Sequence, residues 1–99
     1  MTREDVLQVL RDHEAELRGQ GVIHAALFGS LARGEAGPKS DIDIMVEFDP
    51  DAPVTMWSYV GVIRYVQGPF GRQRTDVVNR LGLNKYIRPN AERDAVHAF

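Results

Sequence analysis

The sequence contains no cysteine, and this absence excludes several kinds of chemistry. Without thiols the chain has no disulfide framework, no thiolate metal site and no cysteine nucleophile. A cysteine-free chain suits a reducing compartment, so we expect a cytoplasmic protein. No apolar run approaches the roughly 20 residues that a membrane-spanning helix needs, and the N-terminus lacks the basic-then-apolar pattern of an export signal. We therefore expect a soluble chain with no membrane partner.

Chain length and charge limit the number of domains and the kinds of partner that the protein can have. The chain has 99 residues, 43% of them hydrophobic, which predicts one compact domain over residues 1–99. A net charge of −2 argues against general affinity for nucleic acid, and we expect no direct nucleic-acid partner. Residues 1–53 hold five Lys/Arg and eleven Asp/Glu, whereas residues 54–99 hold seven and three. The basic second half is either a surface for polyphosphate, RNA or an acidic partner, or a solvated face with scattered arginines.

The first third of the chain predicts a helix followed by a buried strand. Apolar residues recur at helical spacing behind a capping pattern that begins at Thr2, which predicts a helix from about Glu4 to Arg18. The run from Val22 to Phe28 is apolar nearly throughout, as in a strand that is covered on both faces. This strand leads directly into Gly29 and Ser30.

The remaining chain alternates between helix and strand patterns, which predicts the α/β (α+β) class. The segment 54–67 contains strand-favouring residues, but its length and the spacing of its apolar positions favour a helix. The further predicted elements are a short helix over 31–36, a turn over 37–40, a strand over 41–48, a loop over 49–53, a strand over 74–78, a loop over 81–87 and a terminal helix over 89–98.

Two carboxylates open the second predicted strand. Side chains alternate along a strand, so Asp41 and Asp43 project from one face while Ile42 and Ile44 project from the other, into the core. Two residues advance a strand by roughly 6.6 Å, so the two carboxylates can converge on the same one or two hard cations. The alternative is a polar strand edge with no ligand.

A glycine and a small hydroxyl at the end of the preceding strand add a second feature. Gly29 and Ser30 let the backbone approach an anion closely, although an ordinary turn has the same residues. Joined to Asp41, Asp43 and the later Asp76, the pair predicts a place where three carboxylates hold Mg²⁺ beside a triphosphate. Two divalent ions about 3.5–4 Å apart can neutralise the attacking and leaving oxygens of phosphoryl transfer. Carboxylates suit Mg²⁺ or Mn²⁺.

The sequence Gly29-Ser30, ten residues and then Asp41-Ile42-Asp43 resembles the signature of the DNA polymerase β-like nucleotidyltransferases. Within that superfamily, the short chain and the forms Phe-Gly-Ser-Leu-Ala-Arg-Gly-Glu-Ala and Ser-Asp-Ile-Asp-Ile resemble the minimal nucleotidyltransferases (MNT). These are typically the antitoxins of two-gene modules whose partner is a helical HEPN ribonuclease toxin. The resemblance implies the polymerase β-like fold, a small mixed sheet flanked by helices.

The resemblance also implies roles for individual residues. Asp41, Asp43 and Asp76 would be catalytic and bind two Mg²⁺ ions, for which Mn²⁺ can substitute, and Asp76 would activate the attacking hydroxyl. The implied nucleotide-binding residues are Gly29, Ser30, Arg33 and Ser40. ATP would be the substrate, and AMP would pass to a tyrosine of the HEPN toxin.

Three functions stay open at this point. We favour an Mg²⁺-dependent protein adenylyltransferase antitoxin that forms a hetero-oligomer with its toxin. A non-catalytic antitoxin that masks its toxin is disfavoured, because masking needs no metal ligands. A small-molecule transferase resembling the aminoglycoside-modifying enzymes is disfavoured, because 99 residues leave no separate substrate domain. The candidate contacts with a protein acceptor are Trp57, Tyr59, Tyr65 and the basic stretch 72–93.

Overall fold

A computed structural model describes residues 2–35, 41–71, 74–80 and 88–99 of the chain. In chain order the elements are α1 (Arg3–Asp12), α2 (Glu14–Gly19), β1 (Val22–Phe28), α3 (Gly29–Ala32), β2 (Ile42–Phe48), α4 (Met56–Gln67), the 3₁₀ helix η1 (Gly68–Phe70), β3 (Thr75–Asn79), α5 (Arg88–Asp94) and β4 (Val96–His97). The predicted turn over 37–40, with Ser40 in it, lies outside the described residues, and so does the predicted loop over 81–87.

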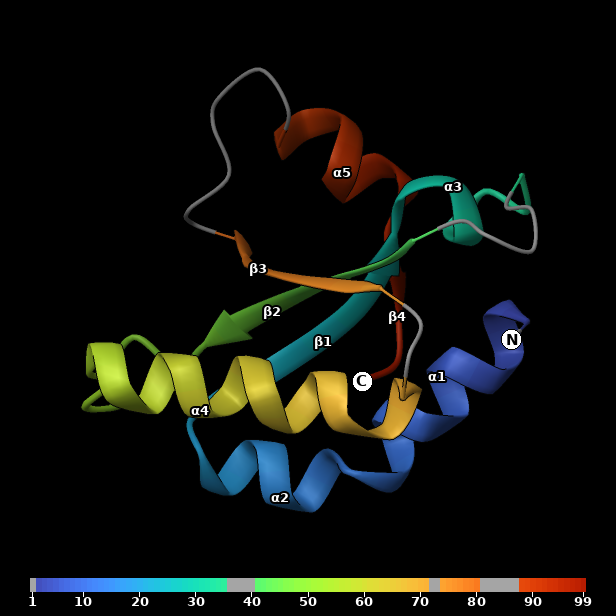
Figure 1. The fold of residues 1–99 in the computed structure, drawn as a ribbon. Coiled ribbons are helices and arrows are strands. Elements are labelled where there is room, and N and C mark those ends of the chain that lie inside the picture. The colour runs from blue at the N-terminus through green and yellow to red at the C-terminus, as the bar shows by residue number, and fades with distance from the viewer. Residues whose placement is uncertain (1, 36–40, 72–73, 81–87) are drawn as a thin grey trace.

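The strands of the described residues form one mixed sheet in the order β3-β2-β1-β4 (Figure 1). β1 pairs antiparallel with both β2 and β4, whereas β2 pairs parallel with β3. A small mixed sheet flanked by helices was predicted, and this part of the prediction is confirmed. The parallel pair places the first residues of β2 and β3 at the same end of the sheet.

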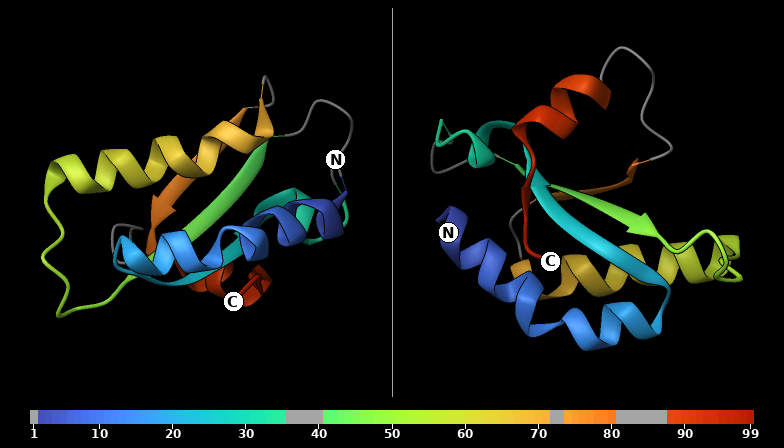
Figure 2. Two further views of the ribbon diagram at one scale, coloured as in Figure 1. Left: turned by 90° about the horizontal axis from the view of Figure 1, so that it is seen from below. Right: turned by 180° about the vertical axis from the view of Figure 1, so that it is seen from behind.

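The helices are divided unequally between the two faces of the sheet. α1, α2 and α4 cover one face, and α5 lies over the other (Figures 1 and 2). Among the described helices, none is both long and apolar enough to cross a membrane. The core lies under α1, α2 and α4, and its fully buried large side chains are Val6, Leu10, Leu17, Val22, Leu27, Ile42, Ile44, Val46 and Val62. Burial of the isoleucine face of β2 leaves the opposite face for polar residues.

The prediction of one N-terminal helix over residues 4–18 is wrong, because the helix is interrupted at His13. The His13 ring Nδ1 lies 2.7 Å from the carbonyl oxygen of Val9, which a continuous helix would pair with the His13 backbone N–H. That N–H instead donates to Leu10 O over 3.2 Å. Apolar spacing continues across the break, and Leu10 and Leu17 are both buried, so the pattern alone does not reveal it.

The prediction of a terminal helix over residues 89–98 is wrong at its C-terminal end. α5 ends at Asp94, and Val96 and His97 then pair with Leu27 and Ala26 of β1. A two-residue strand is too short for an alternating pattern, so its pairing depends on tertiary contact rather than on a local signal. The predicted short helix over 31–36 begins earlier, at Gly29, and ends at Ala32.

The helix predicted over residues 54–67 is confirmed, with a start at Met56. Thr55 caps it: the Thr55 hydroxyl accepts from the Ser58 backbone N–H over 3.1 Å, and the Ser58 hydroxyl accepts from the Thr55 N–H over 2.8 Å. These reciprocal bonds satisfy backbone donors that a helix start leaves unpaired. The strands predicted over 22–28 and 74–78 are also found, as β1 and β3.

Ile44→Ala is expected to lower the free energy of unfolding by about 2–5 kcal/mol, because the fully buried side chain fills the core and a cavity would replace it. As the matched control, Met56→Ala removes a side chain that is 79% exposed and should change the free energy by less than about 0.5 kcal/mol. Urea denaturation of both variants measures the difference. Equal effects of the two substitutions would contradict this assignment of the core.

Candidate active site

The three carboxylates predicted from the sequence lie at the start of the parallel strand pair. Asp43 is register-paired with Asp76, and Asp41 directly precedes β2. The backbone N–H of Ile42 donates to the carbonyl of Arg74 over 2.9 Å, which fixes this end of the pair. The Asp41 and Asp76 side chains are 41% and 45% exposed, so the carboxylates border solvent. Two adjacent strands therefore bring Asp41 and Asp76, which are 35 positions apart in the sequence, to the same corner of the sheet.

The ionisation of the Asp43 carboxyl is affected by its surroundings. Burial raises the pKa of the Asp43 carboxyl above its usual value, and repulsion from Asp76 and then from Asp41 raises this pKa further. Burial is the largest cause of this rise in the pKa, and the two like charges nearby add to it because they disfavour ionisation of Asp43. Together, Asp41, Asp43 and Asp76 form an acidic cluster that would attract a cation.

Arg74 places one positive charge between two of the carboxylates. Its Nε lies 3.7 Å from Asp41 Oδ2 and 3.7 Å from Asp76 Oδ1. The Arg74 side chain is 75% exposed, so water screens both ion pairs. Arg33 and then Arg74 also act on the third carboxylate, where their positive charges oppose the rise in the pKa of Asp43. The sequence predicted Arg74 as the first residue of the third strand and as part of the basic stretch 72–93, but not as a partner of these carboxylates.

Gly29 forms the other wall of this corner. Its φ of +76° lies in the left-handed region, which glycine adopts without strain. A Cβ at this position would clash with Asp43 Oδ2 and stand only 3.2 Å from Asp43 Cγ. Phe28, the last residue of β1, is register-paired with Asp43. The missing side chain therefore lets the end of β1 approach the carboxylate, and Ser30 follows, half-buried, as the second residue of α3.

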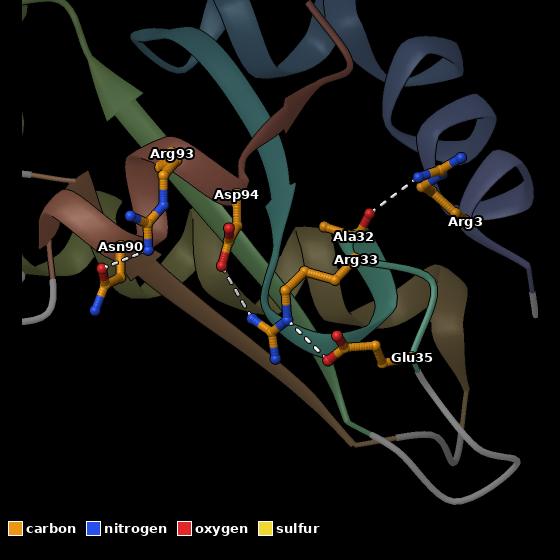
Figure 3. Close-up of polar contacts among 7 residues, drawn as sticks. All are labelled: Arg3, Ala32, Arg33, Glu35, Asn90, Arg93 and Asp94. Carbon is orange, nitrogen blue, oxygen red and sulfur yellow. Dashed lines mark hydrogen bonds and ion pairs between the residues drawn. The ribbon is translucent and has the colours of Figure 1, made fainter.

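Arg33, which was predicted to bind the nucleotide, is paired with two carboxylates. Its Nε lies 3.0 Å from Glu35 Oε2, and its Nη1 lies 3.0 Å from Asp94 Oδ2 (Figure 3). Arg33 thus ties α3 to α5 across 61 positions of sequence. Its donors are shared with two carboxylates, so any phosphate must compete with them. Ser40 lies outside the described residues.

The donor set suits a hard divalent cation by its chemistry. Carboxylate oxygens are the ligands that Mg²⁺ prefers, and a cation would offset the repulsion that Asp76 and Asp41 add to the burial of Asp43. Within the ranges that the structure describes, no group of three or more His, Asp or Glu side chains is already arranged to hold a metal ion. Among the described residues the carboxylates border one corner without forming a complete ligand set, and Arg74 lies between two of them. Asp41, Asp43 and Asp76 are the residues that would hold Mg²⁺.

A second polar cluster lies on the same face of the sheet and was not predicted. The Arg80 guanidinium lies 2.8 Å from Glu47 of β2 and 2.8 Å from Glu92 of α5. His24 and His97 stand edge to face nearby, with ring centroids 5.8 Å apart, and line with these residues a cavity of about 250 Å³. The cluster is assembled from residues of separate elements, so no local motif could have indicated it.

Asp43→Asn is expected to stabilise the metal-free protein at neutral pH, because it removes a partly buried charge that Asp41 and Asp76 repel. The pKa of Asp43 is raised by folding, so the wild-type chain loses stability as the pH rises through that folded-state pKa. Below the unfolded-state pKa, Asp43 is protonated in both states and the advantage of the variant should disappear.

Melting temperatures measured by circular dichroism from about pH 3 to about pH 8 test this expectation across the ordinary carboxyl range. Asp51→Asn removes the same charge from an exposed loop position and serves as the control, with little pH-dependent gain. An Asp43→Asn protein no more stable than the wild type at neutral pH would contradict the proposed repulsion.

Comparison with known sequences places this geometry in a family. Residues 7–97 match the nucleotidyltransferase domain. A protein of Methanocaldococcus jannaschii, provisionally named a protein adenylyltransferase, is 34% identical over 98 residues that cover 97% of each chain. The protein adenylyltransferase MntA of Thermococcus cleftensis is 33% identical over 98 residues, which cover 98% of this chain and 96% of MntA.

Solved structures show the same fold. One provisionally described as a minimal nucleotidyltransferase is 31% identical, with a TM-score of 0.74, and covers 97% of this chain and 95% of its own. A chain from the complex of a tri-AMPylated Shewanella oneidensis HEPN toxin with an MNT antitoxin shares the fold at 14% identity, with a TM-score of 0.61 over 94% of this chain and 71% of its own. The chain therefore belongs to the nucleotidyltransferase domain family, and within it to the minimal nucleotidyltransferases.

Proposed function

We propose that this nucleotidyltransferase is an Mg²⁺-dependent protein adenylyltransferase that acts as a cytoplasmic antitoxin. It moves AMP from ATP to a tyrosine hydroxyl of a HEPN-type toxin and thereby neutralises the toxin. The observation that carries the proposal is the register of β2 with β3, which brings Asp43 and Asp76 together beside Asp41. Near-complete alignment with MntA, a protein adenylyltransferase by name, supports the same class of reaction.

The proposed step is in-line transfer at the α-phosphorus of ATP. The acceptor hydroxyl oxygen forms a bond to this phosphorus, the bond from the phosphorus to the bridging oxygen toward the β-phosphate breaks, and pyrophosphate leaves. Asp76 accepts the hydroxyl proton, which makes the oxygen a better nucleophile. Two bound Mg²⁺ ions would neutralise charge on the phosphate oxygens. Asp41 and Asp43, together with Asp76, would hold the metal.

The nucleotide-binding part of the proposal depends on the end of β1. Gly29 and Ser30 bind the triphosphate: the positive φ of Gly29 turns the chain at the end of β1, where backbone N–H groups and the Ser30 hydroxyl offer donors to phosphate oxygens. Arg33 assists by exchanging one of its carboxylate partners for a phosphate oxygen, a pairing that its planar guanidinium favours. Ser40 is proposed as a further contact on the strength of the family resemblance alone.

The partner surface is proposed at the start of α4. Trp57 is 85% exposed and the neighbouring Met56 is 79% exposed. Neither side chain therefore belongs to the hydrophobic core. The other two aromatic candidates serve the fold: Tyr59 packs against Phe48 with ring centroids 5.8 Å apart, and the Tyr65 hydroxyl lies 3.1 Å from a carboxylate oxygen of Glu16. An exposed tryptophan is a typical centre of a protein interface.

Asp41→Asn and Asp43→Asn are each expected to reduce AMP transfer at least about 100-fold, because each removes a charged metal ligand while its shape is kept. The assay incubates the purified chain, ATP, Mg²⁺ and the product of a neighbouring HEPN-type gene, and detects AMP on a toxin tyrosine by mass spectrometry. Asp51→Asn, which changes the same charge at an exposed position, is the control and should retain full transfer.

The same assay separates the proposal from its alternatives. A wild-type pair that binds tightly without added AMP would establish masking instead of catalysis. A pair that neither binds nor reacts would overturn the antitoxin assignment and favour a small-molecule acceptor. Full transfer by both asparagine variants would show that the carboxylates are not the metal ligands.

Trp57→Ala is expected to weaken binding of the toxin by about 10-fold or more, because exposed tryptophans at interface centres are often hot spots. Its exposure means that the free energy of unfolding should change by less than about 0.5 kcal/mol. Isothermal titration calorimetry measures the affinity, and Gln8→Ala on the exposed side of α1 is the control. Unchanged affinity of Trp57→Ala would place the interface elsewhere.

A further inference from the structure

A cavity of about 180 Å³ lies between α3 and α5, next to the carboxylate corner. α5 and α3 face each other on this side of the sheet, and the Arg33–Asp94 pair joins them (Figure 3). The residues that line the cavity are Phe28, Gly29, Arg33, Asn90, Ala91 and Asp94. Two segments about sixty positions apart in the sequence therefore form one small pocket.

The cavity and the carboxylate corner share a wall. Gly29 lines the cavity and also approaches Asp43 so closely that a Cβ would clash with the Asp43 carboxylate. Phe28, a second lining residue, is register-paired with Asp43. A nucleotide whose phosphates lie at Gly29 and Ser30 therefore has this cavity within reach of its sugar and base.

The size and lining suit one planar ring system. Pockets that enclose a drug-sized ligand typically measure about 300–1,000 Å³, so a cavity of about 180 Å³ suits part of a nucleotide rather than all of it. Phe28 contributes a half-buried aromatic ring and Ala91 a buried methyl group. Aromatic and apolar side chains are the surfaces against which nucleobases stack.

Polar groups lie at the rim of the cavity. Asn90 Oδ1 accepts a hydrogen bond from Arg93 Nη2 over 2.8 Å, and an amide oxygen can accept a second one. In the part of the chain that the structure describes, the Asn90 amide nitrogen donates no hydrogen bond. Asn90 thus offers one donor and one acceptor side by side. The Arg33 guanidinium and the Asp94 carboxylate, already paired with each other, complete the rim.

We infer that this cavity binds the adenine ring of ATP and that Asn90 selects the base, an inference that rests on the proposed adenylyl transfer. An amide side chain pairs with adenine at two atoms: it accepts from the N6 amine and donates to N7. Guanine presents two acceptors at the same edge, which suit an arginine instead. Arg33 is the nearby arginine, and its guanidinium is engaged by Glu35, by Asp94 and, in the proposed function, by a phosphate oxygen rather than by a base. Adenine is therefore the base that this rim accommodates.

The test measures equilibrium binding of three probes, each with Mg²⁺: ATP, GTP and inorganic tripolyphosphate. The wild-type chain should bind ATP about 10-fold more tightly than either other probe, the effect of one good two-atom contact to a base. Asn90→Asp should remove most of this preference, because a second acceptor faces N7, while tripolyphosphate affinity should fall little. Gln8→Glu makes the same chemical change on the exposed side of α1 and is the charge control.

A second variant tests the cavity by volume. Ala91→Phe should fill it, so ATP should bind no better than tripolyphosphate, whose affinity should be retained. Retained tripolyphosphate binding also shows that the variant is folded. Ala15→Phe on the exposed face of α2 is the matched control.

The outcomes distinguish this inference from the function on which it rests. Equal binding of ATP and tripolyphosphate by the wild-type chain, or Asn90→Asp and Ala91→Phe proteins that keep the ATP preference, would overturn the base site alone. Failure of the wild-type chain to bind either ATP or tripolyphosphate would overturn the proposed function together with it.

Discussion

Burial of the Asp43 carboxylate beside Asp76 and Asp41 at one corner of the sheet is the constraint on which the candidate site depends. Parallel pairing of β2 with β3 brings Asp43 beside Asp76, and burial and these neighbours raise the pKa of the Asp43 carboxyl. Such an arrangement costs stability unless a cation is present. Arg74 supplies one positive charge from a solvent-exposed position, which relieves the repulsion only in part.

The opposite face of the same strand offsets this cost. Ile42, Ile44 and Val46 alternate with Asp43, Met45 and Glu47 along β2 and are fully buried under the helices. Apolar burial contributes about 25 cal/mol for each Å² removed from water, so these side chains stabilise the strand that carries the acidic face. Alternation along β2 thus places core residues on one face of the strand and carboxylates on the other. Burial of the core face keeps the strand, and with it the carboxylates, in position.

Features encoded by local pattern could be predicted from the sequence. The alternation in β2, the continuous apolar run of β1 and the helical spacing in α4 are such features. The prediction failed where the outcome depends on contacts between distant segments. The break at His13 requires a side chain to compete for the carbonyl of Val9, and β4 exists only because β1 leaves an edge to pair with.

The candidate site shows the same division. Gly29, Asp41 and Asp43 were predicted because they form a motif, and Asp76 because of its place in the order of strands. The pairing of Arg33 with Asp94 joins residues 61 positions apart, and no spacing rule indicates it. The Arg80 cluster and the α3–α5 cavity likewise depend on where α5 settles on the sheet.

The most direct test of this account is the titration of the Asp43 carboxyl carbon by ¹³C NMR, with and without Mg²⁺. In the metal-free protein the pKa of Asp43 should lie above the ordinary aspartate value of about 3.9, and Mg²⁺ should lower it by replacing repulsion with attraction. An ordinary pKa in the metal-free protein that Mg²⁺ leaves unchanged would contradict the claim that three repelling carboxylates form a cation-binding corner.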